Sequence, residues 1–362
     1  MKIYLVGGAV RDRLLDLPVK ERDWVVVGAT VNDMLKLGYK QVGKEFPVFL
    51  HPQTNEEYAL ARMERKVKPG YQGFTFDTSP EVTLEDDLRR RDLTINAMAE
   101  TPEGKLVDPY GGKKDLKGGI LRHVSPAFAE DPVRILRVGR FLGRYAHLGF
   151  QVAPETVALM QQMVSSGEVN ALVAERVWKE LERALGEKNP EQFFKVLDEC
   201  HALPILFPPL DMLTLIAAAK LTSDTIVRFA ALLHALPKDD IAALCDRYRV
   251  PNAYRELAIL TSLHYQEALR AKTLTAKELL GVLSALDIFR REARFNLFLK
   301  VCEAIADSQQ IAFDASWLMT AAIIAKSVDI QKLIDEGFKN QALAAKLKEK
   351  RLEKIEKWLA NK

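Results

Sequence analysis

The chain has 362 residues, of which 48% are hydrophobic and 28% charged, and its formal net charge is +3. This composition predicts a globular protein of two or three domains, and the small charge neither demands nor excludes a nucleic-acid partner. Three widely spaced cysteines exclude a disulfide framework and a zinc site and suit the reducing cytoplasm, where we expect the protein. No apolar run approaches the roughly 20 residues that cross a bilayer, and no signal peptide is apparent.

The first thirty residues predict a strand, a glycine turn, the opening of a helix and a second strand. Residues 3–6 are apolar and Gly7 and Gly8 follow, a place where backbone N–H groups can approach a phosphate chain. Glu21 and Asp23 are two residues apart, so we expect both carboxylates on one face of the second strand. Each feature alone is more often structural. Together they indicate metal-assisted phosphoryl or nucleotidyl transfer.

The chain changes character near residue 132. Residues 1 to about 125 alternate strand-like runs with turns, whereas helical periodicity continues from Pro132 almost to the end. We therefore expect an α+β protein with a small head and an elongated all-helical remainder. Segment 62–74, charged and then Gly-rich, predicts a mobile loop between strands that could gate a site. The lysine-rich terminal helix, 343–362, favours a solvated surface over a direct RNA contact.

Two segments are rich in arginine. Three arginines precede Asp92, which alone favours a solvated charge run. In a nucleotide-binding protein, however, Arg91 suits a triphosphate and Asp92 a ribose hydroxyl. Pro132 suits the first position of a helix and makes Asp131 its cap. On that helix four arginines fall within about a third of the circumference, which indicates contact with phosphates or base edges: Arg134, Arg137, Arg140 and Arg144.

Four motifs together resemble those of the class II tRNA nucleotidyltransferases, which comprise the CCA-adding enzymes and the bacterial poly(A) polymerases. The motifs lie at residues 5–12 with Glu21 and Asp23, at 90–97, at 108–112 and at 130–134. Their order and spacing argue against a chance match. The resemblance is closest to bacterial CCA-adding enzymes. It continues weakly over 174–181, which is similar to the family's neck-helix motif, and it thins out beyond about residue 210.

The resemblance implies a fold and a domain order. A polymerase-beta-like nucleotidyltransferase palm would form the head at residues 1–135, followed by a helical neck with the base-recognition helix at 136–208. A helical body at 209–272 and a tRNA-binding helical tail at 273–362 would complete the chain. The implied partners are tRNA, through its acceptor stem and 3′ end, with ATP and CTP. We expect no membrane partner, and a monomer or weak dimer.

The resemblance also implies roles for individual residues. Glu21 and Asp23 would hold two Mg²⁺ ions, one at the tRNA 3′-hydroxyl and one at the triphosphate, and Glu57 is the candidate third catalytic acid. Asp131 and Arg134 would select cytosine and adenine, because a carboxylate accepts from their exocyclic amine and a guanidinium donates to their ring acceptors. The remaining nucleotide contacts would come from Gly8, Arg11, Arg91, Asp92, Arg137 and Arg140.

The implied activity is template-independent addition and repair of the 3′-terminal CCA of tRNA from CTP and ATP, with release of pyrophosphate. The nearest alternative is a poly(A) polymerase, or an enzyme that adds only CC or only A. The second is a catalytically silent RNA-binding protein on the same fold. Longer relatives carry a phosphohydrolase domain with adjacent His and Asp ligands. Here Ala235 follows His234, so we expect neither phosphatase nor phosphodiesterase activity.

Overall fold

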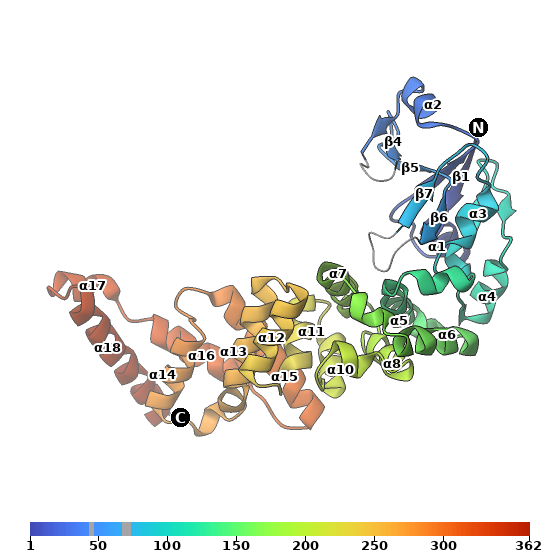
Figure 1. The fold of residues 1–362 in the computed structure, drawn as a ribbon. Coiled ribbons are helices and arrows are strands. Elements are labelled where there is room, and N and C mark those ends of the chain that lie inside the picture. Colours follow the sequence, from blue (N-terminus) through green and yellow to red (C-terminus); the bar gives the residue numbers. More distant parts are fainter. Residues whose placement is uncertain (43–46, 67–73) are drawn as a thin grey trace. The chain divides into compact units, whose positions relative to one another are not determined.

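The computed structural model describes residues 1–42, 47–66 and 74–362. The chain divides into two compact units, Met1–Leu206 (unit 1) and Phe207–Lys362 (unit 2). Over the described ranges every strand belongs to unit 1, whereas unit 2 is built from helices (Figure 1). No helix in those ranges is both long and apolar enough to cross a membrane.

Seven strands of unit 1 form one mixed sheet in the order β3-β4-β5-β2-β1-β8-β9. The central strand β2 runs antiparallel to β1 and parallel to β5. It is buried on both faces because its side chains alternate: Val25 joins one apolar cluster, and Val26 joins a second with Met34 and Phe49. The strands are β1 (Lys2–Val6), β2 (Asp23–Val27), β3 (Lys40–Gln41), β4 (Val48–Leu50), β5 (Glu57–Leu60), β8 (Ala99–Glu100) and β9 (Leu106–Val107).

Short helices cover both faces of this sheet. Helix α2 (Val31–Lys36) contributes Met34 to the cluster of Val26, and α3 (Leu84–Arg89) contributes Leu88 to the cluster of Val25. Helix α1 (Gly8–Leu14) follows β1 directly, so the predicted strand, glycine turn and helix are confirmed.

Glu21 lies outside the second strand, so the prediction that it shares a strand face with Asp23 is wrong. Strand β2 begins at Asp23, which pairs with Val6 of β1 and with Glu57 of β5. Strand β1 ends at Val6 and β5 begins at Glu57, so neither neighbouring strand extends far enough to pair with Glu21.

The segment predicted to be a loop, 62–74, is partly a β-hairpin. Strand β6 (Met63–Lys66) pairs antiparallel with β7 (Phe74–Asp77). The two strands pair in register from Met63 with Asp77 to Lys66 with Phe74, which is why the ends of the segment are regular. Residues 67–73 lie outside the described residues, and the proposed gating role of this segment stays a prediction.

The motif at residues 108–112 caps a helix. The Asp108 carboxylate accepts hydrogen bonds from the backbone N–H of Gly112 at 2.7 Å and of the next residue at 2.9 Å, at the start of α4 (Gly112–Gly118). This end of α4 packs closely on the 3₁₀ turn η1 (Thr94–Asn96). A Cβ at Gly112 would lie 2.2 Å from the carbonyl oxygen of Thr94.

The rest of unit 1 is helical except for one short parallel pair of strands, β10 (Ile120–Leu121) with β11 (Gln151–Val152). Strand β11 therefore interrupts the predicted all-helical neck. It forms because Gly149, at a φ of +86°, turns the chain back onto β10. The helical elements are η2 (Pro126–Glu130), α5 (Val133–Tyr145), η3 (Ala146–Leu148), α6 (Pro154–Ser165), η4 (Glu168–Ala171), α7 (Ala174–Leu185), α8 (Glu191–Glu199) and α9 (Leu203–Leu206).

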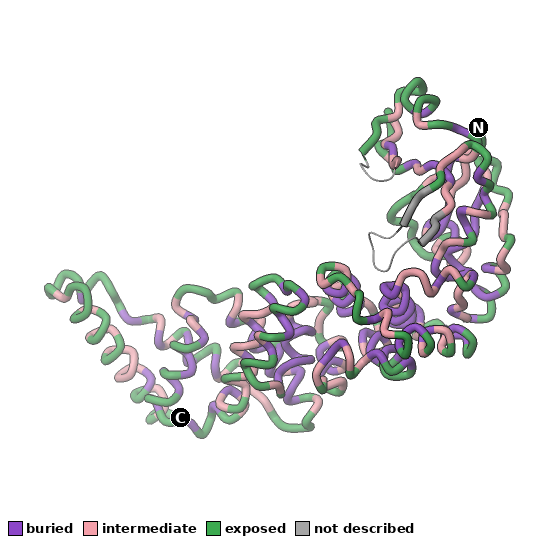
Figure 2. The backbone as a smooth tube through the Cα atoms, viewed as in Figure 1, coloured by how far each residue is buried: buried purple, intermediate pink, exposed green. Residues whose placement is uncertain are grey.

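Unit 2 is a succession of packed helices with a continuous buried interior (Figure 2). The terminal helix α18 packs against α14, α16 and α17, with Ile355 buried and Trp358 lying 4.5 Å from Trp317 between ring centroids. The elements are α10 (Met212–Leu221), α11 (Thr225–Leu233), α12 (Lys238–Tyr248), α13 (Asn252–Leu269), η5 (Ala271–Thr273), α14 (Ala276–Ala285), α15 (Glu292–Gln309), α16 (Ala315–Lys326), α17 (Ile330–Asp335) and α18 (Asn340–Ala360).

His234 is a core residue of unit 2. It lies at the end of α11, is 2% exposed, and its Nδ1 lies 2.9 Å from the carbonyl oxygen of Ala231. Its ring packs edge-on against Tyr265. Across the part of the chain that the structure describes, no three His, Cys, Asp or Glu side chains are grouped so that they could hold a metal.

We predict that Gly112→Ala lowers the free energy of unfolding of unit 1 by about 1–3 kcal/mol, because the added methyl group meets a backbone oxygen that cannot rotate away. Gly118→Ala in the same helix is the control, since its Cβ would lie 3.5 Å from Ile120, an ordinary contact. Denaturant unfolding measures both. Equal stabilities for the two variants would contradict the close packing of α4 on η1.

Candidate active site

An open cavity of about 1610 Å³ lies in unit 1. It brings together all but one of the site residues predicted from sequence: Gly8, Arg11, Glu21, Asp23, Arg91, Asp92, Asp131, Arg134, Arg137 and Arg140. Glu57 is the exception and is absent from the cavity lining. Further arginines line the cavity, so that positive side chains outnumber negative ones. Such a concave basic surface attracts polyanions such as triphosphates and RNA.

Two exposed carboxylates stand at the acidic part of this cavity. Asp23 begins β2 and Glu21 precedes it. Displacement of water by the surrounding protein raises the pKa of Asp23 and the charge of Glu21 raises it further, although Arg91 acts in the opposite direction. Two mutually repelling carboxylates suit a divalent cation, and Mg²⁺ is commonly held by one or two carboxylates plus substrate phosphates. These residues therefore fit a metal site.

Glu57 lies beside Asp23 in the sheet. The two residues are register partners in the parallel pair β2–β5, which places their side chains on the same face. Glu57 is exposed. Its assignment as a third catalytic acid stays a prediction.

Arg91 is held over the glycine turn by a buried acid. Asp87 is 1% exposed and accepts from Arg90 at 2.9 Å and from Arg91 at 3.2 Å. Gly7 makes room for this arrangement: its φ is +69°, and a Cβ there would lie 2.8 Å from Nη1 of Arg91. The sequence therefore places a guanidinium directly beside the N-terminus of α1.

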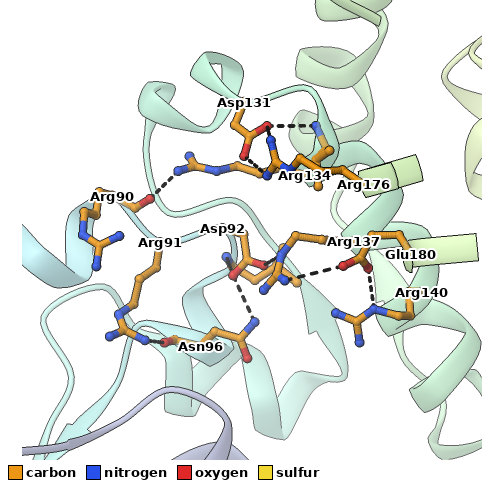
Figure 3. A network of polar contacts seen from close by, with 12 residues as sticks. Arg90, Arg91, Asp92, Asn96, Asp131, Arg134, Arg137, Arg140, Arg176 and Glu180 are labelled. Carbon is orange, nitrogen blue, oxygen red and sulfur yellow. Dashed lines mark hydrogen bonds and ion pairs between the residues drawn. The ribbon is translucent and has the colours of Figure 1, made fainter. Parts of the chain in front are cut away.

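Asp92 is buried within a network of polar contacts that Figure 3 shows. One of its oxygens accepts from Nε of Arg137 at 2.7 Å and the other from the Asn96 amide at 3.0 Å. Burial alone would raise the pKa of Asp92, but the charge of Arg137 and these hydrogen bonds outweigh it and hold the pKa well below its usual range. Both oxygens already have partners, and the predicted contact with a ribose hydroxyl stays a prediction.

The proposed base-selecting pair is held in place by neighbours. Arg176 of α7 donates to both oxygens of Asp131, at 3.0 and 2.7 Å. Asp131 also accepts from the backbone N–H of Val133 at 3.2 Å, but Pro132 and not Asp131 is the N-cap, because α5 begins one residue later than predicted. Arg134 is buried and donates to the carbonyl oxygens of Ala127 at 2.7 Å and Arg90 at 2.6 Å. Figure 3 shows Asp131, Arg134 and Arg176 lying together.

Acids associated with α7 pair with the arginines of α5. Glu180, which is buried, accepts from Nε of Arg140 at 2.6 Å, and Glu187, just beyond the helix, accepts from Arg144 at 2.7 Å. Sequence reasoning missed these partners together with Arg176 and Asn96. Part of a signal was available: Arg176 and Glu180 are four residues apart, which places them on one face of the same helix.

Comparisons with known proteins match two segments of this chain to described families and the whole chain to named relatives. Residues 3–122 match the Poly A polymerase head domain, and residues 149–213 match the family described as the probable RNA and SrmB-binding site of polymerase A. A multifunctional CCA protein of Pseudomonas putida is 54% identical over 363 residues, spanning 98% of this chain and 99% of the relative. A CCA-adding enzyme of Coxiella burnetii is 51% identical over 360 residues, spanning 98% and 95%.

The chain belongs to the class II CCA-adding enzymes. A solved CCA-adding enzyme in an apo form covers all of this chain and 92% of its own, with a TM-score of 0.72 at 23% identity. The Thermotoga maritima CCA-adding enzyme complexed with tRNA has a TM-score of 0.68 at 22% identity and covers 99% and 91%. These likenesses confirm the predicted fold class, a nucleotidyltransferase head followed by a long helical region.

We predict that Glu180→Gln lowers the free energy of unfolding of unit 1 by about 3 kcal/mol, because it leaves the buried Arg140 charge without its principal partner. Lys179→Gln, at an exposed position of the same helix, is the control and should change stability by less than about 0.5 kcal/mol. Denaturant unfolding provides the measurement. A Glu180→Gln protein as stable as the control would refute the energetic importance of this ion pair.

Proposed function

We propose that this CCA-adding enzyme builds and repairs the 3′-terminal CCA of tRNA in the cavity of unit 1, using CTP and ATP. The observation that supports the proposal is the joint presence, in one cavity, of an acid pair with no ion pair in the described structure and a surplus of guanidinium groups. The acid pair is costly without a cation, since the charge of Glu21 disfavours ionisation of Asp23. This cost argues against a catalytically silent RNA-binding protein.

Glu21 and Asp23 would hold divalent metal, with Mg²⁺ the best match to an all-oxygen donor set. When bound, the metal would make the RNA 3′-hydroxyl a better nucleophile and neutralise charge on the triphosphate. Arg11 and Arg91 would bind phosphate oxygens beside the N-terminus of α1, where Gly8 leaves the backbone open to a close approach. Arg137 and Arg140 would add positive charge from α5.

Base selection would be performed by Asp131 and Arg134. Arg176 and two backbone carbonyls fix the orientation of this pair, so little side-chain entropy would be lost when a base binds. Uracil and guanine present a carbonyl where cytosine and adenine carry an amine, so each would leave the carboxylate facing an acceptor. An unsatisfied buried group costs about 1–3 kcal/mol, and two mismatches give rejection of roughly a hundredfold or more.

The tRNA body would be held by the helical neck (136–208), body (209–272) and tail (273–362). The division of the chain after Leu206 lies next to the proposed boundary between neck and body. Cys200, Cys245 and Cys302 are free and buried, and such unoxidised thiols suit a reducing cytoplasm.

The first prediction of function concerns a tRNA transcript that lacks CCA. With Mg²⁺, we expect two additions from CTP alone and a halt after three from CTP plus ATP, resolved on a sequencing gel. Asp23→Asn should reduce extension by at least about a hundredfold, because one metal-holding carboxylate is lost. Long tails from ATP alone would identify a poly(A) polymerase, and no extension by the unmodified enzyme would overturn the proposal.

Asp23→Asn also provides a test through stability. The pKa of Asp23 is raised in the folded protein, so the ionised carboxylate costs stability once the pH rises above the unfolded value of about 4. In metal-free buffer the variant should therefore melt at or slightly above the wild-type melting temperature. The difference between the two melting temperatures should grow as the pH rises from the unfolded to the folded pKa of Asp23. Above the folded pKa it should stay constant. A less stable variant would show that Asp23 has a structural role.

A separate prediction concerns base selection. Asp131→Asn replaces an acceptor by an amide that can also donate, so discrimination against UTP should fall by about tenfold to a hundredfold in kcat/KM. Glu130→Gln, at the adjacent position outside the cavity lining, is the matched control. Unchanged discrimination in Asp131→Asn would assign base selection to other residues.

A further inference from the structure

Phe141 lies at the centre of three guanidinium groups. The carbon atom Cζ of Arg140 is 4.4 Å from the centroid of its ring, that of Arg11 is 5.2 Å away and that of Arg137 is 5.6 Å away. All are within the range of a cation–π contact. Phe141 and these three arginines line the same cavity, and the ring is 4% exposed.

The three arginines come from different parts of unit 1. Arg11 belongs to α1, next to the glycine turn, whereas Arg137 and Arg140 lie one turn apart on α5. Each is tied to its own polar partner: Arg11 to Asn96 at 2.6 Å, Arg137 to Asp92 and Arg140 to Glu180. Among the contacts that the structure describes, the ring of Phe141 is what all three share.

A second ring supports the first. Tyr145, one turn further along α5, lies parallel to Phe141 at 6.3 Å between centroids, and Arg11 is 5.4 Å from its ring. The Tyr145 hydroxyl donates to Asp12 at 3.0 Å, and Asp12 in turn accepts from Nε of Arg11 at 2.8 Å. The Tyr145 end of the aromatic stack is therefore fixed by a hydrogen bond, and Phe141 packs parallel to it.

We propose that Phe141 is a positioning residue whose ring holds Arg11, Arg137 and Arg140 in convergence for the triphosphate of the incoming nucleotide. Three like charges around one ring repel one another, and each guanidinium is anchored to a separate polar group, so the ring is the contact that draws the three together. The negative ring faces offset part of this repulsion, and a polyphosphate would complete the neutralisation. The inference rests on the proposed nucleotide site and adds a residue that supplies no hydrogen bond of its own.

Fluorinated phenylalanines at position 141 test this role. They keep the shape of the ring and progressively weaken the negative electrostatic potential over its faces. Along the series from one to three fluorine atoms we expect a stepwise rise in the KM for both CTP and ATP, reaching roughly tenfold, with a smaller change in kcat. Metal-free binding of CTP and of inorganic pyrophosphate should weaken in the same order, while binding of cytidine should not change. The same series at Phe150, which packs on Tyr145 and has no guanidinium over its ring in the described structure, is the control.

The outcomes separate this inference from the proposed function. A wild-type enzyme that adds CCA, with KM values insensitive to fluorination at Phe141, would overturn the positioning role alone. If cytidine as well as CTP bound more weakly, the Phe141 ring would contact the base of the nucleotide, and the positioning role would again be overturned. Phe141→Leu keeps an apolar side chain but removes the ring, and it should reproduce the trifluoro result. A wild-type enzyme without CCA addition would refute the proposed function itself.

Discussion

The site depends on holding many guanidinium groups close together. Arginines at this density repel one another, and each can be kept in place only where a carboxylate or carbonyl group compensates its charge. The structure supplies these partners from several elements: Asp87 from α3, Asp92 from the segment after it, and Glu180 from α7. Their buried positions make the arrangement rigid, because an unpaired charge in the same place would be costly.

This constraint joins the sheet of unit 1 to the helices that follow it. Helix α5 carries arginines that pair in both directions, with Asp92 of the head on one side and with Glu180 of α7 on the other. The ion pair between Asp131 and Arg176 adds a further link at the start of the same helix. Loss of α7 packing would therefore disturb the proposed nucleotide-binding residues, although α7 holds none of them.

Local sequence patterns predicted much of the fold and ten of the residues that line the cavity. The strand, glycine turn and helix at the start of the chain are set by neighbouring residues, as is the arginine face of α5. Glu21 was misplaced because strand ends depend on where the partner strands stop, which sequence spacing does not reveal. Glu180 and Arg176 were missed because their importance arises from packing against α5, some forty residues away in the chain.

The acids of the site fall into two groups: those that are paired with arginine and those that have no ion pair in the described structure. Asp87, Asp92 and Asp131 are committed to arginines, and the pKa values of Asp87 and Asp92 are lowered accordingly. In the described part of the structure Glu21 and Asp23 have no such ion pair, and the pKa of Asp23 is raised. An acid already paired with arginine gains little from a metal, whereas a carboxylate without an ion pair gains more. The fold therefore separates a region suited to a cation from one suited to phosphate within a single cavity.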